Sequence, residues 1–139
     1  MGELKVCHRY PFAPETVFDA WLDPRIAGRF LFATPTGEMI RAEIDPRVGG
    51  RFVFVDRRPD MGEVEHIGEY LEIHRPRRLV FTFAVPQFDP GLTRVTLDVA
   101  AVDGGCEVTL THEGVLDEWK AQTRQGWGTI LAALELALG

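Results

Sequence analysis

The chain has 139 residues, of which 45% are hydrophobic and 26% charged, and its formal net charge at pH 7 is −6. This length suits one domain over residues 1–139, and the composition excludes a disordered chain. Nucleic-acid binders usually show a basic face, whereas this chain is net acidic. No stretch is long and apolar enough for a membrane span, and the first residues carry no secretory leader. We therefore expect a cytoplasmic protein with no nucleic-acid partner.

The first thirty residues predict one strand and two short helices. Residues 3–12 are typical of a strand. Pro14 suits the first position of a helix, and Glu15 suits the positive end of its dipole. Asp23 and Pro24 repeat this start signal as N-cap and first residue, which predicts a second helix to about Phe30. A loop is expected at residues 34–37.

From Met39 onward the pattern changes to strands. We expect them at residues 39–44, 52–56, 64–73, 79–85, 92–102 and 107–111, with loops at 57–62 and 86–91. Gly68, in the middle of the third of these, favours a bulge or kink. Asp103-Gly104-Gly105 is a strong hairpin signal between the last two strands. Residues 117–138 lack proline and predict a long helix.

The last helix carries a single apolar stripe. Its members, Trp127, Ile130, Leu131, Leu134 and Leu138, recur at helical spacing. Seven strands in meander order need a cover on one face, and this helix is the only element large enough. The predicted fold is therefore α+β. A curved seven-stranded antiparallel sheet wraps the C-terminal helix, and two short helices lie between its first and second strands.

Several motifs along nearly the whole chain resemble one known family. They include Ala13-Pro14-Glu15, Ala20-Trp21, Asp45-x-Arg47-x-Gly49-Gly50-x-Phe52, Gly68-x-Tyr70-x-Glu72-Ile73, Arg78-Leu79-Val80-Phe81-Thr82, Val108-Thr109-Leu110-Thr111-His112 and Gly126-Trp127. The chain is similar to bacterial relatives of the C-terminal domain of the activator of the 90-kDa heat-shock-protein ATPase. That family lies in the SRPBCC (START-like) superfamily. The resemblance implies a helix-grip (START/Bet v-like) fold, a cavity between sheet and helix, and a link to stress response, but no shared reaction. One departure is Phe30, where the family often has Trp.

His112 is the most informative polar residue. It alternates with Val108 and Leu110, so its imidazole is expected to point into the interior near the start of the last helix. One interpretation is a ligand hydrogen bond or a general base. The other is a structural histidine paired with a backbone carbonyl. Because no catalytic triad or dyad spacing is present, no catalytic residue is assigned and His112 remains a weak candidate.

The aromatic residues predict an apolar pocket. We expect one wall to contain Phe52, Phe54, Phe81 and Phe83, the other Trp127, Ile130, Leu131 and Leu134, with Tyr70 and His112 as polar groups. Gly126 and Gly128 flank Trp127, and each costs up to about 1 kcal/mol in a helix relative to alanine. We therefore expect a strand or a ligand to approach the helix closely there.

Metal and disulfide chemistry are not expected. His8, His66, His74 and His112 show no metal-ligand spacing, and two cysteines cannot form a zinc-finger site, so we expect no metal and no cofactor. Cys7 and Cys106 are interpreted as buried or half-buried thiols, which could face each other only if the first and last strands pair.

Three functional hypotheses follow. The first is a protein that binds a small hydrophobic ligand between the sheet and the C-terminal helix, without a defined catalytic activity. The second is a cyclase- or hydrolase-like enzyme that uses the same cavity, with His112 as base and Tyr70 orienting the substrate. The third is a chaperone-associated interaction module, by analogy with the namesake. An exposed edge strand could also support a homodimer.

Overall fold

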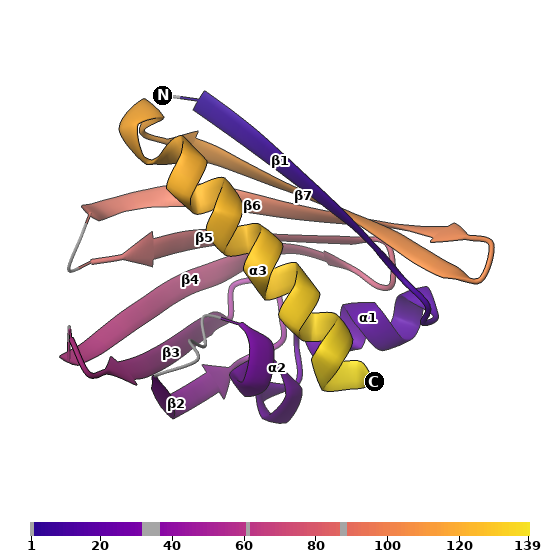
Figure 1. Ribbon diagram of the computed structural model, residues 1–139, viewed down its shortest axis with the longest axis horizontal. Helices are drawn as coiled ribbons and strands as arrows, with labels where there is room; N and C mark the ends of the chain where they lie inside the picture. The colour runs from indigo at the N-terminus through magenta and orange to yellow at the C-terminus, as the bar shows by residue number, and fades with distance from the viewer. Residues whose placement is uncertain (1, 32–36, 61, 87–88) are drawn as a thin grey trace.

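The computed structural model describes residues 2–31, 37–60, 62–86 and 89–139 (Figure 1). Its strands are β1 (Gly2–Tyr10), β2 (Glu38–Ile44), β3 (Arg51–Arg58), β4 (Gly62–His74), β5 (Arg78–Val85), β6 (Asp89–Val102) and β7 (Gly105–Val115). Its helices are α1 (Pro14–Ala20), α2 (Pro24–Phe30), the short 3-10 helix η1 (Asp117–Trp119) and α3 (Lys120–Leu138). The predicted order of one strand, two helices, six strands and a long helix is confirmed.

The strands form one antiparallel sheet in the order β1-β7-β6-β5-β4-β3-β2. Strands β2 to β7 run as a meander, and β1 joins the far edge by pairing with β7. Helix α3 crosses one face of the sheet diagonally, and α1 and α2 lie near its C-terminal end (Figure 1). The helix-grip fold is therefore confirmed.

A proline begins each of the two short helices, and a side-chain cap precedes the second. Pro14 and Pro24 occupy the first helical positions, as predicted. The side chain of Asp23 accepts a hydrogen bond from the backbone N–H of Arg25 at 2.9 Å. This bond satisfies a backbone donor that the helix itself leaves without a partner.

The strands extend further than the sequence pattern predicts. Strand β3 runs to Arg58 and β4 begins at Gly62, so both ends of the predicted loop at 57–62 are strand. Strand β6 begins at Asp89 and β7 continues to Val115. Polar residues can occupy such strand ends because the ladder satisfies their backbone groups. The predicted loops at 34–37 and 86–91 lie partly outside the described residues.

Gly68 serves close packing and not the predicted bulge. It pairs with Phe52 in the β3–β4 ladder, and the irregularity in β4 lies between Tyr70 and Glu72. A Cβ atom at Gly68 would lie 1.9 Å from the carbonyl oxygen of Thr82 and 2.4 Å from the Phe52 ring. Glycine is therefore required here because the Phe52 ring lies against the backbone of β4.

Helix α3 is fastened to the sheet along its buried stripe. Trp127, Leu131 and Leu134 are buried on it. The hydroxyl of Tyr10 on β1 donates to the carbonyl oxygen of Leu131 at 2.8 Å, and burial raises the pKa of this tyrosine. Trp21, at the C-cap of α1, contacts Trp127 with ring centroids 6.5 Å apart. The interior beneath the middle of α3 is consequently packed.

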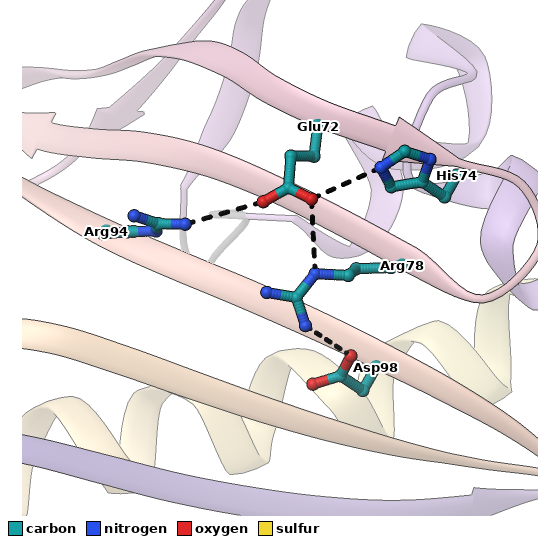
Figure 2. A network of polar contacts seen from close by, with 5 residues as sticks. All are labelled: Glu72, His74, Arg78, Arg94 and Asp98. Carbon is teal, nitrogen blue, oxygen red and sulfur yellow. Dashed lines mark hydrogen bonds and ion pairs between the residues drawn. The ribbon is translucent and has the colours of Figure 1, made fainter.

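The outer face of the sheet carries a charged network over β4, β5 and β6 (Figure 2). Glu72 contacts Arg78 and Arg94, each at 3.6 Å, and His74 at 3.3 Å. Arg78 also contacts Asp98 at 3.1 Å. These side chains are 36–65% exposed, so each pair is worth about 0–1 kcal/mol. The network keeps this face polar and adds little to stability.

The β1–β7 pairing places the two thiols on neighbouring strands without bringing them opposite each other. Cys7 pairs with Thr109, and Cys106 pairs with Tyr10. Both cysteines are free, with Cys106 buried and Cys7 exposed. The expectation of a buried or half-buried thiol is therefore confirmed for Cys106 and wrong for Cys7.

No strand approaches Gly126 or Gly128 closely, so this part of the expectation is wrong. A Cβ atom built at either position meets no atom within 4 Å. Neither glycine is among the residues with positive φ. Both positions therefore have room for a side chain and a backbone that alanine adopts readily.

Replacing Gly126 or Gly128 by alanine should raise the free energy of unfolding by about 0.5–1 kcal/mol each, because alanine lowers the entropy of the unfolded chain and adds no clash. Gly68→Ala is the control and should lower it by about 2 kcal/mol or more, since its Cβ overlaps Thr82 and Phe52. Urea denaturation measures all three. A destabilised Gly126→Ala would mean that the helix needs its glycine.

Candidate functional site

A cavity of about 520 Å³ lies at the end of the sheet where β7 runs into η1 and α3. This is the end of α3 away from the C-terminus (Figure 1). Phe83, Thr93 and His112 line it from the sheet, and Trp119 and Thr123 line it from η1 and α3. Trp119 is 49% exposed, so the cavity opens to solvent beside it. We call this space the end cavity; its volume falls within the about 300–1,000 Å³ of small-molecule sites.

A chain of hydrogen bonds forms the inner wall of the end cavity. The indole N–H of Trp127 donates to Nδ1 of His112 at 3.0 Å. Nε2 of His112 lies 2.7 Å from Oγ1 of Thr93, and the Thr93 hydroxyl donates to the carbonyl oxygen of Phe83 at 2.8 Å. Because that hydroxyl has a single proton, the N–H of the contact with Thr93 must be on His112. His112 is therefore the Nε2–H tautomer, with both ring nitrogens engaged.

His112 is held neutral by its surroundings. It is 3% exposed, and burial lowers its pKa to about 4. Protonation would add a second N–H, which would face the indole N–H of Trp127. The interior placement of His112 agrees with the alternation along its strand. Its hydrogen-bond partners are the side chains of Thr93 on β6 and Trp127 on α3, and not the backbone carbonyl of the structural interpretation.

His66 packs against Phe83, one of the residues that line the end cavity. Its ring stacks on Phe83 with centroids 6.2 Å apart and an interplanar angle of 7°. Its Nδ1 lies 3.3 Å from the carbonyl oxygen of Phe54. Burial lowers the pKa of His66 to about 4, and the positive charge of Arg58 acts in the same direction. Near neutral pH this second histidine is also uncharged.

The residues predicted to form the pocket fall into two groups. Phe83 and His112 line the end cavity, and Trp127 contacts both from behind. The others do not line it and belong to the packed core, with Ile130 at its margin: Phe52, Phe54, Tyr70, Phe81, Ile130, Leu131 and Leu134. Phe52 alone contacts three of these rings at centroid distances of 5.4–5.8 Å.

The mouth of the end cavity consists of residues that the sequence analysis missed. Leu116 and Trp119 line it just before α3, and Gln122 and Thr123 line it from the first turns of that helix. Arg58 lines it from the end of β3. The sequence feature that could have indicated this mouth is Trp119, a large aromatic residue that precedes the long helix and lies outside its apolar stripe.

Metal and membrane features are absent from the part of the chain that the structure describes. There, no group of three or more His, Cys, Asp or Glu side chains could hold a metal ion. Within the same ranges, no helix has the length and hydropathy needed to cross a bilayer.

The two buried histidines predict a pH dependence of stability. Both have a pKa of about 4 in the folded protein against 6.5 ordinarily, so between these values the unfolded chain binds protons that the folded protein does not. The free energy of unfolding should therefore fall as the pH drops from 6.5 to 4, by on the order of 3 kcal/mol per histidine. The lowered pKa values of Asp19, Asp23 and Glu43 act below 4.5. Urea denaturation between pH 7 and 4.5 and ring ¹⁵N chemical shifts test this; midpoints near 6.5 for His66 and His112 would contradict it.

Trp127→Phe should lower the free energy of unfolding more than Trp21→Phe does. Both variants lose the same ring volume, but Trp127→Phe also leaves Nδ1 of His112 without its donor. The indole N–H of Trp21 has no hydrogen-bond partner among the described residues, which makes it a matched control. We expect a difference of about 1–2 kcal/mol in thermal or urea unfolding. Equal losses would show that the bond to His112 contributes nothing.

Comparison with known proteins gives one family and many similar folds. The family model described as Activator of Hsp90 ATPase homolog 1-like protein matches residues 11–139. No curated protein matches the sequence significantly.

Solved structures from several bacteria are similar over almost the whole chain. Protein CV1439 from Chromobacterium violaceum is 23% identical, with a TM-score of 0.86 over 98% of this chain and 96% of that one. The AHSA1-like protein from Aeromonas hydrophila is 25% identical, with a TM-score of 0.85 over 99% and 92%. CalU16 from Micromonospora echinospora is 20% identical, with a TM-score of 0.74 over 99% and 76%. Since the family model spans all but the first ten residues, the chain belongs to the family of Activator of Hsp90 ATPase homolog 1-like proteins.

Proposed function

We propose that this protein binds a small, largely apolar ligand in the end cavity. The observation that carries the proposal is the cavity itself, which has about 520 Å³ of space beside Phe83, Leu116 and Trp119. Apolar surface that faces water is a source of binding energy, about 25 cal/mol for each Å² that a ligand covers. Proteins of this fold commonly bind hydrophobic ligands, which agrees with this use of the cavity.

The geometry favours a site at the start of α3 over the central site expected from the sequence. Beneath the middle of the helix, Leu131 and Leu134 are 0% exposed and Phe52 packs among neighbouring rings. Opening that region would cost buried contacts on several elements at once. A ligand at the end cavity needs no such rearrangement, since the space exists beside a half-exposed Trp119.

The arrangement of the residues around the end cavity favours ligand binding over catalysis by His112. A general base needs a free lone pair and a pKa near the working pH. The lone pair at Nδ1 of His112 accepts from Trp127, and its pKa is about 4. Tyr70, the proposed orienting group, packs between Phe52 and Phe81, and burial raises its pKa. Neither residue is placed to move a proton for a substrate.

Association with a chaperone draws only on the family description. The same fold serves many functions, so a shared fold does not transfer a partner. The outer face of the sheet carries solvated ion pairs around Glu72 and Arg78 (Figure 2). Chaperone association therefore stays a prediction beside the ligand-binding proposal.

Thr123→Phe should weaken ligand binding because it puts a ring into the end cavity from α3. Gln125→Phe adds the same ring to the same helix at an exposed position that does not line the cavity. The neutral fluorescent probe N-phenyl-1-naphthylamine reports binding by its emission. We expect saturable binding to the wild type and to Gln125→Phe, and an affinity lower by about tenfold or more in Thr123→Phe, as for loss of well-packed apolar contact.

Two results would count against the proposal. One is the absence of saturable probe binding to the wild-type protein. The other is an equal loss of affinity in Thr123→Phe and Gln125→Phe, which would place the probe elsewhere. Thermal unfolding of each variant checks that the fold is retained.

A further inference from the structure

Strand β1 forms one edge of the sheet (Figure 1). It pairs with β7 along one side, and the sheet order places no described strand on its other side. An antiparallel strand turns half of its backbone N–H and C=O groups to each side. The outer side of β1 is therefore a row of backbone groups with which a further strand can pair.

The two edges of the sheet differ in how well they can add a strand. At the opposite edge, β2 has seven residues, and its register is irregular between Met39 and Arg41. Such irregularities twist an edge strand and disfavour pairing with another chain. Strand β1 has nine residues, and its register with β7 is regular from Glu3 to Tyr10. The edge better suited to pairing is therefore β1.

Helix α3 holds β1 in the conformation that pairing needs. The Tyr10 hydroxyl donates to the carbonyl oxygen of Leu131 at 2.8 Å. The side chain of His8 contacts Glu135 at 2.9 Å. Leu4 and Tyr10 are buried in the core beneath the helix. A strand that is already ordered loses little conformational entropy when a partner binds.

Charges on the outer face of β1 favour one register with a second copy of the chain. Two antiparallel copies keep their outer faces together only when the two-fold axis passes through a residue. An axis at Val6 pairs all nine residues and puts Glu3 opposite Arg9 of the second copy. An axis at Lys5 opposes two lysines, and an axis at Cys7 opposes Lys5 to Arg9. Because like charges directly opposite each other are destabilising, the full-length register is favoured.

Arg9 keeps the capacity for a second anionic partner. Its Nε–H donates to Glu107 on β7 at 2.9 Å, but the Arg9 side chain is 74% exposed. Exposed pairs of this kind contribute little to stability, so Glu107 does not hold the guanidinium tightly. A guanidinium carries five N–H donors, which lets it contact a carboxylate of its own chain and one of a second copy.

We infer that β1 is a dimerisation strand, through which two copies of this chain pair antiparallel about Val6. The two sheets continue into one another across the two-fold axis, and Glu3 of each copy contacts Arg9 of the other. A closed pair of this kind uses both β1 edges and leaves neither open to further chains. The inference concerns assembly, and it goes beyond the proposed function and does not depend on it.

A charge reversal at each edge of the sheet tests which edge pairs. Glu3→Lys opposes like charges at both ends of the inferred pairing and should raise the dissociation constant of the dimer about tenfold or more. Within the chain Glu3 faces Glu113, so this reversal brings no like charges together there. Glu43→Lys makes the same change at an exposed position of β2 and should leave the dissociation constant within about twofold. Size-exclusion chromatography with light scattering over a dilution series measures both, and thermal unfolding checks the fold of each variant.

Disulfide cross-linking through Cys7 tests the register. In the inferred pairing, Lys5→Cys places a new thiol opposite Cys7 of the second copy, so mild oxidation should link the two chains. In the control Lys5→Cys/Cys7→Ser, the new thiols face each other only if the axis lies at residue 5. In the wild-type protein, which is the second control, the Cys7 thiols face each other only if the axis lies at residue 7. Cys106 is buried and takes no part.

Each outcome decides for or against the inference. A dimer that Glu3→Lys weakens more than Glu43→Lys does, with links in Lys5→Cys alone, supports it. A wild-type protein that stays monomeric at micromolar concentrations overturns it. It is also overturned by a dimer that Glu43→Lys weakens as much or more, by the absence of links in Lys5→Cys, or by links in either control. Probe binding in the end cavity is measured separately, so the proposed function stands or falls by its own test.

Discussion

The bond between Trp127 and His112 joins the long helix to the sheet at the point where packed core gives way to open space. On one side of it, Leu131 and Leu134 are fully buried. On the other side lies the end cavity. The indole N–H can donate to Nδ1 only while the imidazole stays neutral, and Thr93 fixes the tautomer by accepting a hydrogen bond from Nε2–H. The inner wall of the end cavity thus depends on His112 remaining neutral, and burial of its ring keeps it so.

The architecture could be predicted from the sequence because its signals are local and periodic. Pro14 and Pro24 mark helix starts, Asp103-Gly104-Gly105 marks a hairpin, and the stripe through Trp127 marks the covering helix. Strand ends were predicted less well. Pairing with β4, where Arg58 lies opposite Gly62, decides that β3 continues as far as Arg58. Gly68 shows the same limit, because the ring that requires glycine belongs to another strand.

The candidate site could be predicted only in part, for a reason of geometry. Alternation correctly turned Phe83 and His112 inward, and both line the end cavity. It could not reveal how closely α3 approaches the sheet at each point along its length. The strand aromatics beneath the middle of α3 therefore showed the same inward alternation in the sequence as those beneath its first turns. Trp119 and Arg58 were missed because each lies beyond the periodic part of its element.

The three tryptophans occupy environments that differ in a useful way. Trp21 and Trp127 are 2% and 3% exposed, whereas Trp119 is 49% exposed at the rim of the cavity. Indole emission moves to shorter wavelength when the ring leaves water. A molecule that settles beside Trp119 would dry that ring and leave the two interior rings as they were. The emission of Trp119 would therefore report whether the end cavity is occupied. Compounds that do not fluoresce can then be screened against the native protein without a dye.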